Sequence, residues 1–236
     1  MARRRCGDRL VVAAIDFGTT YSGYAYSFKN EFEKNPLEIR TCQKWQNSAG
    51  LNAYKVPSSI LFDNEGTFKS FGFTAETEYN DLVDEEMEQG WRFFRRFKMS
   101  LYREMNTEKG GRLCRNLKLK DEQGRRMSAM DVFSAAILFL KDHFLTTLKD
   151  AFVGIKPDDV HWILTVPAIW SDAAKQFMRE AAKKAGIKDN QLDLALEPEA
   201  AAVYCKEITV KTKSGKEGSK ELSAFSPGEK FLLIDI

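Results

Sequence analysis

The residues with the clearest potential for chemistry lie near the start of the chain, in the segment DFGTTY from Asp16 to Tyr21. Gly18 permits a tight turn, so the amides from Gly18 to Tyr21 can converge on phosphate oxygens. The hydroxyls of Thr19 and Thr20 can donate further hydrogen bonds, and the Asp16 carboxylate can hold a hydrated Mg²⁺ through water. The segment predicts a phosphate-binding turn. The competing interpretation is a plain hairpin turn in which Asp16 accepts local amide hydrogen bonds.

Two strands are needed to position this turn. Leu10 to Phe17 is apolar and rich in Val and Ile until its aspartate, which predicts a strand buried on both faces. Tyr21 to Phe28 alternates aromatic with small or polar residues, so the two segments are expected to form a hairpin with the turn at its tip. This placement favours the phosphate-binding interpretation. A third strand is predicted at Lys55 to Phe62, with Pro57 at its entry or on a sheet edge.

Phe73 to Met130 is mixed in character and predicts an inserted small subdomain at about residues 73–130. It contains an acidic run, a basic aromatic segment and a Gly-Gly break. Its aromatic residues are expected to pack a subdomain core rather than to form a binding face: Trp91, Phe93, Phe94 and Phe97.

Strands and helices alternate in the second half of the chain. Ser128 is expected to cap a helix whose apolar residues recur at helical spacing. The segments that follow are a strand at His161 to Val166, a helix at Ser171 to Ala185 ended by Gly186, a strand at Leu192 to Leu196 and a short helix at Pro198 to Lys206. Such alternation favours parallel pairing. The order predicts an α/β fold of the ribonuclease-H-like kind, a mixed sheet with flanking helices.

The last part of the chain is expected to leave this lobe. Residues 210–229 are polar and predict a loop or linker, and residues 230–236 form an apolar run that ends near Asp235. We expect residues 1–209 to form a first lobe. The terminal run would then be the first strand of a second, truncated lobe.

Composition argues against several classes of protein. Lys and Arg total 36 against 34 for Asp and Glu, with a net charge of +2, so no basic face for nucleic acid is expected. No apolar run approaches the roughly 20 residues of a membrane helix. The four cysteines are widely spaced and predict neither a zinc site nor a disulfide framework. A cytoplasmic protein is expected.

These motifs resemble the superfamily of actin, sugar kinases and the 70-kDa heat shock proteins, whose first phosphate loop is a DxGTT-type hairpin. Val166 to Ala168 and the segment LEPEAAA resemble the VPA and NEPTAAA segments of the heat shock branch. Finer features resemble its divergent member-12 branch: SGYAYSF (22–28), FKM (97–99), PAIW (167–170) and KQFMREAA (175–182).

The resemblance implies roles for three charged residues. Glu197 matches a carboxylate that orders Mg²⁺ waters or the attacking water. Taken alone it is better explained as an acid at a helix N-terminus, but its place after a strand, in the right order after the DxGTT hairpin, favours the role in the site. Lys98 matches a lysine that reaches the γ-phosphate, with a solvated basic face as the alternative. Asp235 matches the aspartate that opens the second phosphate loop, and otherwise is a polar strand end.

The function implied is binding of ATP with Mg²⁺ between two lobes, with slow hydrolysis that regulates a protein partner or client. An alternative is a scaffold that keeps the fold without hydrolysis. Divergence around Lys98 and the replacement of a family arginine by Lys175 favour that alternative. Lys175, together with Ile169 in place of a family aromatic residue, also argues against coupling of the conventional chaperone kind. A sugar or metabolite kinase is a third reading, but the segments around Pro167 and Glu197 are closer to the heat shock branch.

Overall fold

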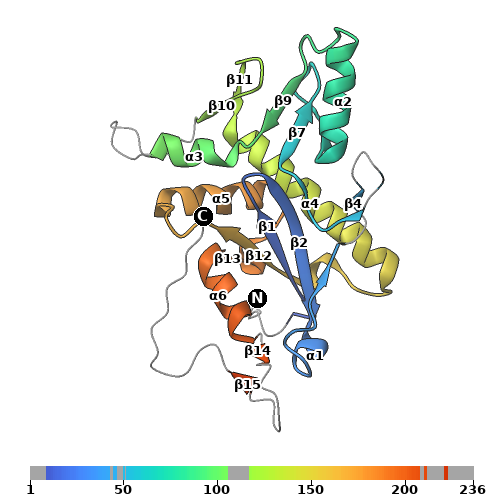
Figure 1. Ribbon diagram of the computed structural model, residues 1–236, viewed down its shortest axis with the longest axis vertical. Helices are drawn as coiled ribbons and strands as arrows, with labels where there is room; N and C mark the ends of the chain where they lie inside the picture. Colours follow the sequence, from blue (N-terminus) through green and yellow to red (C-terminus); the bar gives the residue numbers. More distant parts are fainter. Residues whose placement is uncertain are drawn as a thin grey trace.

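A mixed sheet forms the centre of the computed structural model (Figure 1), which describes residues 9–42, 45–46, 50, 52–105, 117–207, 210–211 and 221–222. Its main path runs in the order β13-β12-β1-β2-β3. These strands are β1 (Val11–Phe17), β2 (Tyr21–Phe28), β3 (Arg40–Thr41), β12 (Val160–Val166) and β13 (Leu192–Leu196). β2 is antiparallel to both neighbours, whereas β1, β12 and β13 are parallel. This is the strand order of a ribonuclease-H-like lobe, so the predicted fold class is confirmed.

The predicted hairpin is present, but the third strand differs from the prediction. Lys55 to Phe62 is divided between β6 (Val56–Pro57), which pairs with the start of β2, and β7 (Ser59–Phe62), which belongs to a second sheet. Pro57 lies on the edge pairing, where its missing N–H is tolerated. The third strand along the main sheet is β3, which at two residues is too short to show an alternating pattern.

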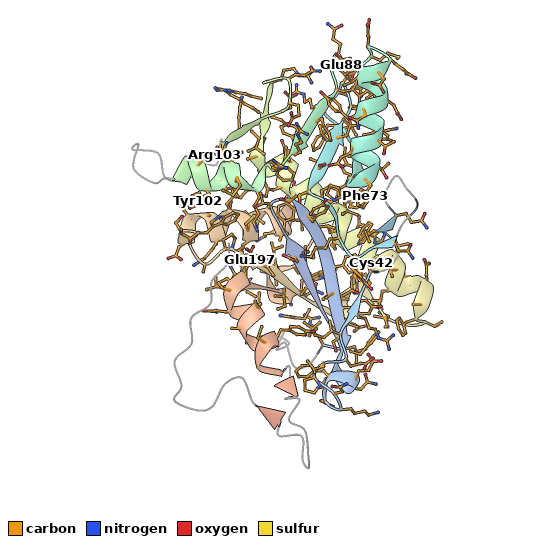
Figure 2. All side chains as sticks on the ribbon, in the orientation of Figure 1. Cys42, Phe73, Glu88, Tyr102, Arg103 and Glu197 are labelled. Atoms are coloured by element: carbon orange, nitrogen blue, oxygen red, sulfur yellow. The ribbon has the colours of Figure 1, made fainter. Side chains whose placement is uncertain are left out.

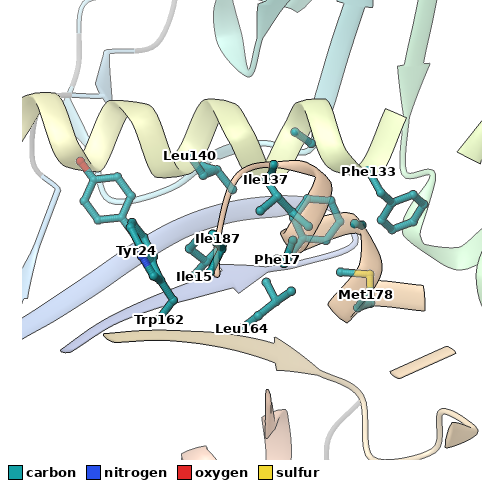
Figure 3. Close-up of a cluster of buried hydrophobic side chains, with 14 of the residues drawn as sticks. Ile15, Phe17, Tyr24, Phe133, Ile137, Leu140, Trp162, Leu164, Met178 and Ile187 are labelled. Atoms are coloured by element: carbon teal, nitrogen blue, oxygen red, sulfur yellow. The ribbon is translucent and has the colours of Figure 1, made fainter. Parts of the chain in front are cut away.

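The long helix α4 (Ala129–Ala151) covers one face of the sheet, as its apolar spacing predicts (Figure 3). Ser128 caps the helix and accepts a hydrogen bond from the amide of Asp131. Apolar side chains of the helix that recur at helical spacing are buried, as predicted: Val132, Phe133, Ala136, Ile137, Leu140, Phe144 and Leu148. Helix α5 (Asp172–Lys184) packs beside α4, is capped by Ser171 and is followed by Gly186 at a φ of 85°.

A second sheet in the order β8-β7-β9 lies beyond the turn-bearing end of the central sheet (Figure 1). It contains β8 (Phe68–Phe71) and β9 (Arg92–Arg95), and helix α2 (Phe73–Asp84) packs on β7 and β8. Successive residues of β9 point to opposite faces. Phe93 therefore joins a small cluster and stacks on Tyr79 with ring centroids 4.4 Å apart, whereas Phe94 joins the main core.

The four aromatic residues of this segment are packing residues, as expected, but they serve two cores. Trp91 and Phe93 belong to the small cluster, while Phe94 and Phe97 belong to the main one. The ring of Phe97 lies against Phe133 of α4, with centroids 5.1 Å apart. The second sheet is thereby anchored to the central lobe through aromatic contacts.

The prediction that β1 is buried on both faces is wrong. Its burial alternates: Val11, Ala13, Ile15 and Phe17 are buried under α4, but Val12 and Ala14 are only partly covered. On that second face, Val12 and Ala14 line an apolar groove of about 580 Å³ together with Phe32 and Ile39. The sheet is therefore covered on one face, and at this end the described residues leave the other face open.

The remaining elements complete the connections. They are α1 (Lys29–Phe32), β4 (Trp45–Gln46), β5 (Asn52–Ala53), α3 (Lys98–Met105), β10 (Lys118–Lys120), β11 (Arg126–Ser128), α6 (Glu197–Glu207), β14 (Val210–Lys211) and β15 (Glu221–Leu222). The predicted strand at residues 230–236 lies outside the described residues. Among the helices that are described, none is long and apolar enough to cross a membrane.

Candidate phosphate-binding site

The predicted turn connects β1 to β2 and depends on the absence of a side chain at Gly18. A Cβ atom added there would lie 2.1 Å from the backbone oxygen of Tyr21, closer than any real contact. Thr20 and Tyr21 are exposed at the tip, so the turn is accessible to a ligand. The geometry explains the glycine as a requirement of the turn itself.

Ser58, in the segment just after β6, holds the turn in place. Its hydroxyl donates to the backbone oxygen of Gly18 at 2.7 Å, and its amide donates to the backbone oxygen of Thr20 at 2.8 Å. The Ser22 and Ser58 hydroxyl oxygens are also 2.7 Å apart. Because Ser58 is buried, these bonds are shielded from competing water and fix two carbonyl groups of the turn.

Asp16 lies at the end of β1, with its side chain 40% exposed and both carboxylate oxygens in use. Its Oδ1 accepts a hydrogen bond from the Thr165 hydroxyl of β12 at 3.1 Å. Its Oδ2 lies 2.5 Å from the ammonium of Lys55. The competing interpretation of the turn, in which Asp16 accepts local amide bonds, is not the arrangement found, since both contacts come from distant side chains.

Lys98 and Glu197 form an ion pair with 2.5 Å between Nζ and Oε1, although they are 99 residues apart in the chain. The Lys98 side chain is 4% exposed and the Glu197 side chain 26%. The ammonium also lies 5.6 Å from the ring centroid of Trp170, a cation–π distance. Lys98 is therefore not part of a solvated basic face, because its charge is buried and directed inward.

Local backbone geometry directs Lys98 inward. Arg96 has a φ of 51°, the left-handed conformation that non-glycine residues rarely adopt. This turn separates β9 from α3 and places Phe97 and Lys98 on the core side, while the Arg95 side chain stays exposed and pairs with Glu122 at 2.8 Å. A single strained residue thus separates a surface arginine from a buried lysine.

The predicted residues converge on one end of the central sheet. Asp16 ends β1 and Glu197 follows β13, and the carboxyl ends of parallel strands meet at the same sheet edge. Glu197 lies at the end of α6 nearest this sheet (Figure 2). Phe97, next to Lys98, contacts Phe17, next to Asp16, with ring centroids 5.8 Å apart. Asp235 lies outside the described residues.

Sequence reasoning missed three contributors to this site. Ser58 braces the turn, Lys55 neutralises Asp16, and Trp170 lies beside the Lys98 ammonium. Their distance along the chain hid them, because only the pairing of β6 with β2 brings Lys55 and Ser58 to the turn. The segment KVPSS offered one weak signal, since it places a cation and two hydroxyls around an edge proline.

The carboxylates at this sheet edge suit a cation that keeps its water ligands rather than one bound directly by side chains. The described residues contain no group of three or more His, Cys, Asp or Glu side chains able to hold a metal ion directly. Mg²⁺ usually keeps several waters and needs one or two carboxylates, which Asp16 and Glu197 supply at the same sheet edge. These residues fit Mg²⁺ bound through water.

The turn and the strand order define the class of fold. The chain contains a ribonuclease-H-like α/β lobe with a DxGTT hairpin, which is the type of lobe found in actin-like ATPases. No family model matches the chain. The chain is 43% identical over 204 residues to human heat shock 70 kDa protein 12B and 42% identical over 205 residues to mouse heat shock 70 kDa protein 12A. The predicted resemblance to the 70-kDa heat shock family, and to its member-12 branch, is confirmed.

These matches cover 84% of the chain but only 28% and 29% of the two relatives. Among solved structures, the chain resembles MreB5 of Spiroplasma citri bound to ADP, with a TM-score of 0.42 and 14% identity, over 86% of this chain and 42% of that one.

Proposed function

We propose that this chain is the first lobe of the nucleotide-binding domain of a divergent 70-kDa heat shock-like protein, and that the complete domain binds ATP or ADP. The observation that carries the proposal is the buried Lys98–Glu197 pair, which lies at the same sheet edge as the DxGTT turn. A structural hairpin would not need a buried ammonium and a partly exposed carboxylate beside it. Groups that bind and polarise phosphate do need such neighbours.

The residues divide the work by their chemistry. The amides from Gly18 to Tyr21 and the threonine hydroxyls bind phosphate oxygens, and Asp16, Glu197 and Asp235 accept hydrogen bonds from Mg²⁺ waters. When bound, Mg²⁺ would neutralise part of the negative charge of the phosphates. Lys98 steadies the terminal phosphate or the attacking water. Its pairing with Glu197 and its contact with Trp170 hold the ammonium ready, at little reorganisation cost.

Nucleotide binding is tested by calorimetry on a full-length protein that contains this chain. We expect ATP and ADP to bind, and ATP to bind more tightly when Mg²⁺ is present. A heat signal no different from buffer, with and without Mg²⁺, would refute the nucleotide-binding proposal.

Slow hydrolysis is tested in single-turnover experiments with Lys98→Ala and Glu197→Ala. Loss of a positioned charge from a phosphoryl-transfer site should slow turnover by about 10- to 1,000-fold. Lys188→Ala is the matched control, since Lys188 also pairs with a carboxylate, Asp158, at 2.6 Å, but at an exposed position far along the chain from the turn. Unchanged rates in both site variants would show that the catalytic roles are wrong.

A scaffold that binds nucleotide without hydrolysing it is a second candidate. Lys175, at the position of a family arginine, pairs within its own helix with Asp172 at 3.8 Å, an arrangement with no bidentate geometry. Nucleotide binding without turnover in the unmodified protein would support this candidate. Transfer of phosphate to a sugar would instead support a kinase.

We further propose that the protein is located in the cytoplasm and acts there through a protein partner or client. The four cysteines are widely spaced and include no CxxC pair, which supports a reducing compartment. Nucleic acid is not expected as a partner, because the near-balanced charge gives no broad basic face.

A further inference from the structure

Lys55 places a second ammonium at the phosphate-binding turn. Its Nζ lies 2.5 Å from Oδ2 of Asp16, and the two side chains are 50% and 40% exposed. An ion pair at such exposure contributes little to stability, because water screens it and the long side chain loses entropy. Exchange of this pair for a ligand at the mouth of the turn would therefore cost little stability.

The backbone is shaped to let Lys55 reach this position. Asp16 faces Gly23 across the β1–β2 pairing, and β6 continues alongside β2 with Val56 opposite Ser22. A Cβ atom added at Gly23 would lie 3.1 Å from Cγ of Lys55 and 3.0 Å from the backbone oxygen of Tyr54. The missing side chain at Gly23 thus leaves the space that the Lys55 stem crosses.

The same short segment fixes both the turn and the cation. Ser58, three residues after Lys55, holds the backbone oxygens of Gly18 and Thr20. The backbone at Lys55 is consequently tied to the turn, while its four-carbon side chain remains half exposed and can swing. A phosphate bound at the turn would lie within reach of this ammonium.

We propose that Lys55 is a phosphate-binding residue of this site that alternates with Mg²⁺ in neutralising Asp16. Without nucleotide, the ammonium pairs with Asp16. With nucleotide and Mg²⁺, Asp16 accepts hydrogen bonds from the metal's waters and Lys55 turns to the phosphate oxygens. Without Mg²⁺ the Lys55 contact matters more, because the metal no longer neutralises most of the phosphate charge. Nucleotide binding therefore depends less on Mg²⁺ when Lys55 is present than when it is removed. This inference rests on the proposed nucleotide-binding function.

The test measures the dissociation constant of ADP by calorimetry on the full-length protein, in excess Mg²⁺ and in EDTA. The diagnostic quantity is the ratio of the EDTA value to the Mg²⁺ value. Lys55→Met removes the ammonium but keeps the apolar stem, and it should raise this ratio about tenfold over the unmodified protein, since a hydrogen bond to a charged group is lost. Lys55→Arg should leave the ratio near that of the unmodified protein.

Two further variants separate this effect from general damage. Lys188→Met breaks another exposed lysine–aspartate pair, at 2.6 Å, and should leave the ratio unchanged. Gly23→Ala fills the space used by the Lys55 stem and should raise the ratio in the same direction as Lys55→Met. Thermal melting of each variant confirms that it is folded.

The outcomes distinguish this inference from the proposed function. If the unmodified protein binds ADP and Lys55→Met shows the same EDTA to Mg²⁺ ratio, the role of Lys55 is overturned while the nucleotide-binding function stands. If the unmodified protein binds ADP in neither condition, the proposed function fails and the role of Lys55 fails with it.

Discussion

At the scale of single residues, the turn is shaped by one missing side chain and one hydroxyl. Because Gly18 has no side chain, its backbone can lie closer to the backbone oxygen of Tyr21 than a Cβ atom would allow. Ser58 donates hydrogen bonds to two carbonyl groups of the turn. Neither residue carries charge. These neutral contacts hold the backbone of the turn next to Asp16, and the role proposed for Asp16 depends on that position.

Gly18→Ala should therefore abolish measurable nucleotide binding, because the turn must open to relieve the 2.1 Å contact. We expect the change to destabilise the fold by about 1–3 kcal/mol, as overpacking usually does. The control is Gly124→Ala in the β10–β11 hairpin, where φ is 80° and no atom lies within 4 Å of the added Cβ. If Gly18→Ala binds ADP as Gly124→Ala does, the turn is not the phosphate site.

At the scale of elements, α4 is the support on which the turn depends. The helix lies along the buried face of β1 and β2, and its residues Phe133 and Ile137 pack against the strand that ends in Asp16 and Phe17 (Figure 3). His143, which is also on α4, forms a hydrogen bond through Nδ1 with the hydroxyl of Tyr24 on β2, at 2.8 Å. Burial raises the pKa of Tyr24. Packing and a buried polar contact thus fix the hairpin on the helix.

Ile137→Ala should lower the free energy of unfolding by about 2–5 kcal/mol, because it removes a fully buried side chain and leaves a cavity under the sheet. Leu138→Ala on the same helix is the control. Leu138 is 39% exposed, so its loss should cost under about 1 kcal/mol. Urea unfolding of both variants measures the difference, and equal midpoints would contradict the role assigned to the buried face.

At the scale of the whole molecule, the proposed phosphate contacts lie at one edge of the central sheet. They are the turn, Asp16 and the Lys98–Glu197 pair. The apolar groove near Val12 and Phe32 lies on the face of the sheet opposite α4. The chain also spans less than a third of the length of the relatives it matches.

The 236-residue chain alone should consequently bind ATP weakly, with a dissociation constant no better than about 1 mM. The physical reason is that phosphate contacts without a closing second lobe leave most of the nucleotide in water. Calorimetry on this chain and on the full-length protein makes the comparison. A submillimolar affinity for the chain alone would show that the first lobe is sufficient.

The sequence by itself determined the elements with long periodic patterns and the position of the turn. The hairpin at Asp16, the capped helix after Ser128 and the strand before Glu197 lie where local patterns predict them. The fold class followed from their order. These features are local, because a buried strand or an amphipathic helix shows its periodicity within its own residues.

Only the tertiary structure decided which side chains meet. The division of Lys55 to Phe62 between two sheets, the pairing of Lys98 with Glu197 and the contact of Lys55 with Asp16 all join segments far apart in the chain. The partial exposure of Val12 and Ala14 likewise depends on what packs against the sheet, not on the strand's own residues. Such contacts leave no periodic trace in the sequence, since they arise from how distant elements pack rather than from the local backbone.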